Sequence, residues 1–260
     1  MNDIKVKTMA EFYSEGIEPD FLFWVGSAGS FDDRAKKITK AFVKILNVAN
    51  ISFGVLGTEE SSSGDVAKRA GNEFLFQMQA LSNIELLNGY NVKNIVTTCP
   101  HSFNTFKNEY SSLGGNFNVR HHSEFIIYLI KEKKISLSKN LNGKRITYHD
   151  PCYLGRANNI YSEPRKVIKS LGVNMLEMKR SKRKSFCCGA GGAQMFKEPE
   201  KGLQDININR TEEALSLNPD IIATGCPFCN TMMTDGVKSV NEGAASVMDI
   251  AELIAENISC

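Results

Sequence analysis

Apolar segments typical of strands alternate with helical patterns along the whole chain. Between the strand-like runs, apolar residues recur three and four positions apart, the period of a helix with one buried face, as at Ala35, Ile38, Phe42, Ile45 and Leu46, and at Val167, Ile168 and Leu171. Alternation of this kind predicts βαβ units and an α/β fold with parallel sheets. The predicted strands are FLFWVG (21–26), ISFGVLG (51–57), NIVTTC (94–99), RITYHD (145–150), VNMLEM (173–178) and IIATGC (221–226).

The chain also resembles itself at a spacing of about 125 residues. A slide of 125 places Ser27 on Cys152 and the segment 62–64 (SSG) on 187–189 (CCG), and a slide of 127 places TTCPHS on TGCPFC. Two homologous halves explain this match. We predict two pseudo-symmetric tandem repeats, residues 1–135 and 136–260, each a small parallel sheet flanked by helices. A polar linker at about 133–144 joins them.

Composition excludes several classes of protein. The 31 Lys and Arg residues nearly balance 29 Asp and Glu, so the net charge of +2 provides no basic field for nucleic acid. The N-terminus lacks the apolar core of a signal peptide, and the longest apolar runs, such as FIIYLI (125–130), are too short to span a bilayer. We therefore expect a cytoplasmic protein without a transmembrane segment. In a reducing compartment, clustered cysteines indicate metal binding or redox chemistry rather than disulfides.

Five of the seven cysteines cluster in the second half, and they are the candidate metal ligands. In parallel α/β sheets, sites form where strands end. There, one cysteine follows RITYHD and another ends IIATG, before a helix that we expect to begin near Asn230. Four thiolates suffice for zinc or an ordinary cluster, so five, with an adjacent pair, favour an iron–sulfur cluster of unusual shape. The five are Cys152, Cys187, Cys188, Cys226 and Cys229.

Other residues near these cysteines are expected to support the site. Backbone N–H groups in CCGAGG, at Gly189 and Gly191, can hydrogen-bond to cluster sulfurs. For His149, in YHDPC, we favour a supporting hydrogen bond over a proton relay. We expect Asp150 to cap the turn before Pro151.

Two other kinds of site compete with an iron–sulfur cluster. Zinc could be held tetrahedrally by Cys152, one of the adjacent pair, Cys226 and Cys229. The segment CPFC after a strand is also how thiol–disulfide enzymes present a reactive thiol. The three further cysteines at positions compatible with the repeat favour a metal over dithiol chemistry.

The motifs HDPCYLGR, CCGAGG and GCPFC resemble the cysteine-rich CCG domain. This family includes the B subunit of heterodisulfide reductase, the C subunit of anaerobic glycerol-3-phosphate dehydrogenase and the lactate-utilisation iron–sulfur subunit. The resemblance covers nearly the whole chain. It implies two α/β halves with clusters near their interface, each a non-cubane [4Fe–4S] cluster. Carried over by position, the second-half ligands are the five cysteines named above.

The first half departs from the family pattern at its ligand positions. The equivalents of four ligands are Ser27, Ser62, Ser63 and Ser102, and only Cys99 is retained. A serine hydroxyl stays protonated near neutral pH and is a poor iron ligand, so we expect one cluster per chain. That all four are serine points to deliberate replacement or to relaxed selection. We assign no ligand role to Cys99 or Cys260, and no catalytic partner is visible for the histidines at 101, 121 and 122.

The resulting hypothesis is an electron-transfer iron–sulfur subunit of a cytoplasmic oxidoreductase complex. The resemblance implies exchange of electrons with a ferredoxin-like or flavin-containing subunit, as in the lactate, glycolate or glycerol-3-phosphate systems, and it is compatible with a place at the periphery of a membrane complex. The basic run KRSKRK (179–184) precedes the cysteine pair and is a candidate docking surface for an acidic partner. The alternatives are a disulfide or thiol reductase, and a zinc-stabilised or metal-free scaffold.

Overall fold

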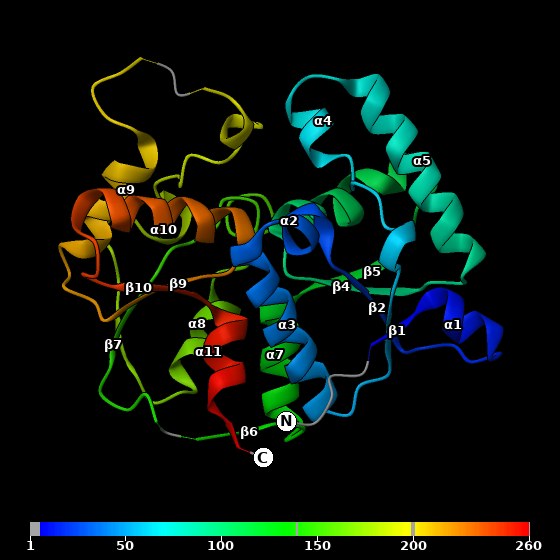
Figure 1. Cartoon of the computed structure of the whole chain (residues 1–260), viewed down its shortest axis with the longest axis horizontal. Helices are drawn as coiled ribbons and strands as arrows, with labels where there is room; N and C mark the ends of the chain where they lie inside the picture. Colours follow the sequence, from blue (N-terminus) through cyan, green and yellow to red (C-terminus); the bar gives the residue numbers. More distant parts are fainter. Residues whose placement is uncertain (1–5, 139, 199–200, 260) are drawn as a thin grey trace.

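Two parallel sheets, one from each half of the chain, form the framework of the molecule (Figure 1). The computed structural model describes residues 6–138, 140–198 and 201–259. The first sheet has the order β1-β3-β2-β4-β5, and every neighbouring pair is parallel. Its strands are β1 (Lys7–Thr8), β2 (Phe21–Trp24), β3 (Phe53–Val55), β4 (Asn94–Thr97) and β5 (Asn118–His121).

The second sheet repeats the topology of the first. Its order is β10-β9-β7-β8, again parallel throughout, so β8, β7, β9 and β10 correspond to β3, β2, β4 and β5. The strands are β7 (Arg145–Tyr148), β8 (Asn174–Leu176), β9 (Ile221–Thr224) and β10 (Ser246–Asp249). The predicted α/β fold with two tandem repeats is therefore confirmed, and each of the six predicted strands is present.

Helices connect the strands and cover the sheets. In the first half they are α1 (Met9–Ser14), α2 (Gly26–Phe31), α3 (Asp33–Val48), α4 (Asp65–Arg69), α5 (Glu73–Gly89), α6 (Pro100–Asn104) and α7 (His122–Lys131), with shorter helical turns at Gly57–Glu59 (η1), Thr105–Glu109 (η2) and Tyr110–Leu113 (η3). In the second half they are α8 (Ser162–Lys169), α9 (Ile206–Leu215), α10 (Pro227–Asn241) and α11 (Ile250–Asn257), with turns at Lys182–Lys184 (η4) and Gln194–Phe196 (η5). Among the described residues, no helix combines the length and the apolar character that crossing a membrane requires.

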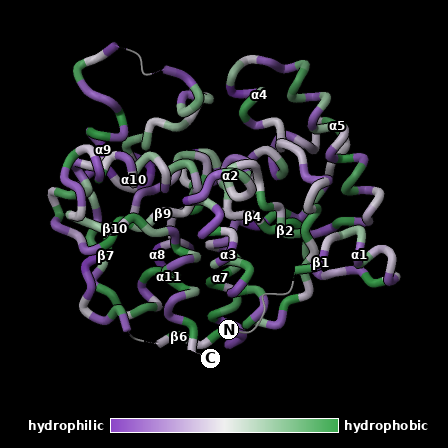
Figure 2. Tube along the Cα trace, viewed as in Figure 1, coloured by the Kyte–Doolittle hydropathy of each residue, from purple (hydrophilic) through white to green (hydrophobic). Residues whose placement is uncertain are grey.

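One hydrophobic core is shared by the two halves. The central helices α3, α7, α8 and α11 lie between the sheets (Figure 1), and their buried side chains belong to a single cluster with those of β2, β4, β7 and β9. Figure 2 shows the same concentration of apolar residues in the strands and in the inner faces of these helices. The apolar periodicity over α3 and α8 predicted these buried faces. Burial of this shared surface holds the halves together.

The predicted linker at 133–144 is more ordered than its polar composition suggested. Its residues Ser136–Leu137 form strand β6, which pairs antiparallel with the C-terminal strand β11 (Ile258–Ser259). The side chain of Ile135 is buried in the shared core. The connection is thus attached to the far end of the chain, and the division at 135/136 stays a prediction.

Two expectations about local structure need correction. Helix α10 begins at Pro227, three residues before the predicted start near Asn230, because proline is well suited to the first turn, with Cys226 as the N-cap residue. Strands β5 and β10 are absent from the sequence-based prediction. Each lies at a sheet edge, and only one or two of its four residues are apolar, so its pattern does not stand out.

Candidate metal centre

The five second-half cysteines lie together where strands β7 and β9 end. Cys152 follows β7, Cys226 is the N-cap residue of α10, and Cys229 lies in the first turn of that helix. The adjacent pair comes from the long loop between β8 and α9. This placement follows from the parallel sheet, since the carboxyl ends of its strands share one edge.

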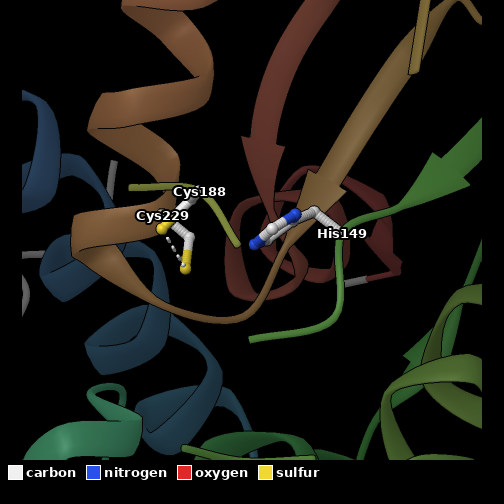
Figure 3. Close-up of side chains that lie close together, drawn as sticks. All are labelled: His149, Cys188 and Cys229. Carbon is white, nitrogen blue, oxygen red and sulfur yellow. Dashed lines mark hydrogen bonds between the residues drawn. The ribbon is translucent and has the colours of Figure 1, made fainter. Parts of the chain in front are cut away.

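An unbroken series of thiol–thiol contacts joins the five side chains. The Sγ atoms of Cys188 and Cys229 are 3.3 Å apart (Figure 3). The thiols of Cys152 and Cys187, of Cys187 and Cys188, and of Cys229 and Cys226 also lie close enough to shift each other's pKa. Three of the five are buried, and the exceptions, Cys152 and Cys187, are partly exposed. The arrangement therefore has a buried interior and one edge that reaches the surface.

The cysteine cluster favours anionic sulfur at two positions. The pKa of Cys187 is held far below its usual value by hydrogen bonds from Cys152 and Cys188, and the N–H of Gly189 also donates to its Sγ at 3.2 Å. Burial alone would raise the pKa of Cys226, but the hydrogen bond from Cys229 and the charge of His101 lower it. Thiolate is the form that binds metals.

The two glycines predicted to support the site differ in their surroundings. Gly189 has a φ of +94°, and an added Cβ would lie 3.3 Å from both Ile206 and Met232, so glycine is required there by conformation and by space. Its N–H faces Cys187, as described above. At Gly191 an added Cβ would meet nothing within 4 Å. The role of Gly191 toward a cofactor stays a prediction.

His149 lies at the end of β7 with its ring directed toward the cysteines (Figure 3). Its nearer ring nitrogen and the sulfurs of Cys188 and Cys229 all lie within 4.8 Å of one another. The Nε–H of Arg210 donates to His149 Nδ1 at 3.0 Å, and Arg210 is fully buried. Because a guanidinium is always protonated, this bond occupies the Nδ1 lone pair and leaves the proton on Nε2. Burial, and then the charge of Arg210, lower the pKa of His149 to about 3.

A buried ion pair fixes the loops around the centre. The carboxylate of Asp150 accepts two hydrogen bonds from Arg165, at 2.7 and 2.8 Å, and one from the backbone N–H of Lys182 at 2.7 Å. The side chain thus joins three segments in place of the predicted turn cap. Ser185 in turn donates to the backbone carbonyl of Asp150, so the loop that carries the cysteine pair is tied to the one that carries Cys152.

The four serines at the vacated ligand positions converge with Cys99, as the repeat implies. Together they line one cavity of about 130 Å³, and the hydroxyl of Ser102 donates to that of Ser63 at 3.3 Å. Cys99 is buried, as expected. Burial, and then the nearby Cys226, raise the pKa of Cys99. The serine-lined cavity therefore adjoins the cysteine cluster.

The three buried histidines of the first half have polar partners that the sequence did not reveal. His101 Nδ1 is 2.8 Å from Asp65 Oδ2, and His122 Nε2 is 2.9 Å from Asp249 Oδ1. His121 Nε2 lies 3.1 Å from the carbonyl of Gly225, next to Cys226. These partners are between 36 and 127 residues away along the chain, so the local sequence could not indicate them.

Comparison with known proteins agrees with this architecture. The model of the CCG cysteine-rich domain matches residues 22–107 and again 146–234. The chain is 46% identical over 258 residues to the "Probable iron-sulfur-binding oxidoreductase FadF" of Bacillus subtilis, covering 98% of this chain and 36% of that protein. It is 46% identical over 247 residues to the "EtfAB:quinone oxidoreductase" of Syntrophomonas wolfei, covering 92% and 34%.

A more distant relative comes from a methanogen. The chain is 34% identical over 244 residues to the D subunit of the dihydromethanophenazine:CoB–CoM heterodisulfide reductase of Methanosarcina barkeri, covering 91% of this chain and 58% of that protein. The chain thus spans between about one third and three fifths of the length of these relatives. Among solved structures, the glutamate racemase of Aquifex pyrophilus aligns with a TM-score of 0.37 at 16% identity, over 91% of this chain and 81% of that one, a likeness too weak to carry an argument. With one match in each half, aligned with the two sheets and their ligand loops, the chain belongs to the CCG cysteine-rich domain family.

Proposed function

We propose that this chain is the electron-transfer iron–sulfur part of an oxidoreductase complex, with one non-cubane [4Fe–4S] cluster held by Cys152, Cys187, Cys188, Cys226 and Cys229. The observation that carries the proposal is the continuous series of contacts among five thiols, two of which favour the thiolate form. When bound, such a cluster supplies one-electron chemistry. The chain's own residues position it and set its surroundings.

The donor set fits iron better than zinc. Structural zinc takes four tetrahedral ligands, whereas five thiols lie within one set of contacts here. The N–H of Gly189 already donates to the sulfur of Cys187, and the Nε2–H of His149 is directed toward the sulfurs of Cys188 and Cys229. Donors to sulfur are the usual means by which a protein adjusts a cluster.

The partly exposed edge of the centre is where we place the redox partner. Residues 182–184 (KRK) form the turn η4 and are exposed, and the backbone of Lys182 is held by Asp150 beside the Cys152 loop. Positive charge at this edge would attract an acidic ferredoxin-like or flavin-containing subunit. We extend the proposal to a cytoplasmic location, which includes the periphery of a membrane complex. We also propose that the system oxidises lactate, glycolate or glycerol-3-phosphate, or that it resembles heterodisulfide reductase.

The alternative of dithiol chemistry at CPFC has less support. A thiol that attacks an external disulfide must be accessible, but Cys226 is completely buried and Cys229 is 3% exposed. The zinc or metal-free scaffold remains the competitor that the first experiment addresses.

The test is the content of iron, acid-labile sulfide and zinc in protein purified without oxygen, together with its visible spectrum. We expect about four iron and four sulfide per chain with broad brown absorbance. Replacing Cys187 with serine should lower the iron content, whereas Cys99→Ser, a matched change at a cysteine outside the ligand set, should not. About one zinc per chain without visible absorbance would refute the proposal, and about eight iron would show that the serine half also binds metal.

A further inference from the structure

The serine-lined cavity of the first half is built from both halves of the chain. Its walls include Ser27 on α2, Ser62 and Ser63 before α4, and Ser102 on α6. Pro227 and Phe228, from the first turn of α10, close the opposite side. Since Phe228 lies between Cys226 and Cys229 in the sequence, the cavity and the cysteine cluster share a wall.

One end of this cavity is polar and rigidly held. Asp65 accepts from Arg69 Nε at 3.0 Å as well as pairing with His101, and both members of the Asp65–His101 pair are buried. The imidazole packs against Tyr153, with ring centroids 4.4 Å apart, and edge-on against Phe228 at 5.4 Å. Because the Asp65 carboxylate can only accept, Nδ1 carries a proton, and Nε2 is the ring nitrogen available to a ligand: it accepts in the neutral ring and donates in the protonated one. Serine hydroxyls supply further donors at this end.

A buried indole adds one more donor next to the cavity. The Nε1–H of Trp24 has no hydrogen-bond partner among the described residues, and the side chain is completely buried. It lies beside Gly26, a lining residue, at 4.0 Å from the position that a Cβ would take there, and Ser102 Oγ is 3.9 Å from the same point. A buried donor without a partner is costly, which argues for a role at this location.

The other end of the cavity continues into an apolar surface pocket. This pocket, of about 290 Å³, shares Ser27, Ala28, Phe196 and Phe228 with the cavity. Phe31 and Met195 complete its apolar lining, and Phe31 is 82% exposed. The combined space is therefore apolar toward solvent, with hydrogen-bond donors at its inner end beside the cysteine cluster.

We propose that this space binds the ring of a quinone-type electron acceptor, with a ring carbonyl at the Ser102–His101 end and the apolar substituents toward Phe31 and Phe196. A neutral ring suits the aromatic walls, and its carbonyl oxygen is an acceptor for the serine hydroxyls and for Nε2–H of the protonated His101 ring, the form that the Asp65 carboxylate favours. An anionic ligand fits less well, because Asp65 and the thiolates lie close by. The inference rests on the proposed function, and it names the acceptor class and its binding site. Conversion of the ring to a quinol takes two electrons, from the redox partner, and two protons, one at each oxygen.

The experiment is a binding titration of the metal-loaded protein, purified without oxygen, with 2,3-dimethyl-1,4-naphthoquinone. This ring has no free position for a thiol to attack. Quenching of the single tryptophan, Trp24, reports occupancy next to the cavity, and equilibrium dialysis gives the stoichiometry. We expect about one quinone per chain, with affinity at least tenfold above that for 2,3-dimethylnaphthalene, which lacks the carbonyls.

Two variants and one control locate the site. Ser102→Ala removes a donor and should weaken binding about tenfold, the effect of losing one hydrogen bond. Ala28→Phe places a bulky side chain where the cavity meets the surface pocket and should abolish quinone binding. Ser112→Ala, at an exposed serine, should leave the affinity unchanged. The inference would be overturned if the quinone and 2,3-dimethylnaphthalene bound with equal affinity. It would also be overturned if neither Ser102→Ala nor Ala28→Phe changed the affinity for the quinone. Iron and sulfide are measured on the same samples: a normal cluster without quinone binding defeats this inference alone, and absence of iron defeats the proposed function.

Discussion

The shared core predicts that the two halves unfold together, and Phe42→Ala tests this directly. Phe42 on α3 is completely buried and makes edge-on contacts with Phe23 at 5.1 Å, His122 at 5.9 Å and Phe125 at 6.5 Å between ring centroids. It belongs to the same cluster as side chains of β7 and α11 in the second half. Truncating such a side chain removes packing that no neighbour can replace.

The expected cost is about 3–5 kcal/mol, the range for a buried Phe→Ala change. In a chain of this size each kilocalorie lowers the melting temperature by about 2–4 °C, so the midpoint should fall by roughly 6–20 °C. Phe74→Ala is the matched control. Phe74 on α5 is 76% exposed, and its truncation should cost no more than about 0.5 kcal/mol.

The assay combines Trp24 fluorescence, which reports on the first half, with hydrogen–deuterium exchange of peptides from β4 and β9 during urea unfolding. If the two halves share one core, Phe42→Ala shifts the urea midpoints of all three signals by the same amount. A shift confined to Trp24 and β4, with β9 unchanged, would mean that each half has its own core. That result would refute the reasoning.

Three further predictions concern charge and hydrogen bonding. His149→Phe should lower the reduction potential of the metal centre by some tens of millivolts, because it removes a donor directed at sulfur, whereas His149→Gln should shift it less; redox titration followed by EPR measures both. Burial raises the pKa of Asp249 from 3.8 to about 7, so its contribution to stability is complete below about pH 4 and is lost as the pH rises through 7. Asp249→Asn should therefore gain stability relative to the parent from pH 4 to 7, by up to about 4 kcal/mol, and a constant difference in urea unfolding would contradict this. Charge reversal of residues 182–184 should slow reduction by an acidic partner at low salt and have little effect at high salt, while the same reversal of the exposed lysines in 131–134 should leave the rate unchanged; equal rates in stopped-flow assays would count against the docking surface.

Much of the fold could be predicted from the sequence because its strongest signals are local. Central strands such as β4 and β9 are apolar runs, and the repeat aligns them residue for residue at a spacing of 127. The two edge strands β5 and β10 have weaker patterns and escape such a prediction. The cysteine positions were predictable for the same reason as the strands, since ligand loops follow strand ends.

The groups that complete the site could not be found in this way. Arg210 is an arginine on a helix, and nothing in its local sequence separates it from an exposed one; its partner, His149, lies 61 residues away. The pairs Asp65–His101 and Asp150–Arg165 likewise join residues that are 36 and 15 positions apart and lie on different elements. Convergence of the serines followed from the repeat, but one wall of their cavity comes from Phe228, in the other half.

The separation between the shared core and the ligand loops bears on the history of the duplication. The core lies between the sheets and uses the central helices, whereas the cysteine and serine positions lie beyond the ends of the strands. The residues at the ligand positions of one copy can therefore change without loss of the fold. Neither domain, however, is expected to be stable alone, because a single half would expose the apolar surface that is buried between the two. We therefore expect the two domains to be inherited, transferred and fused to other modules as a pair, even in lineages where only one of them binds metal.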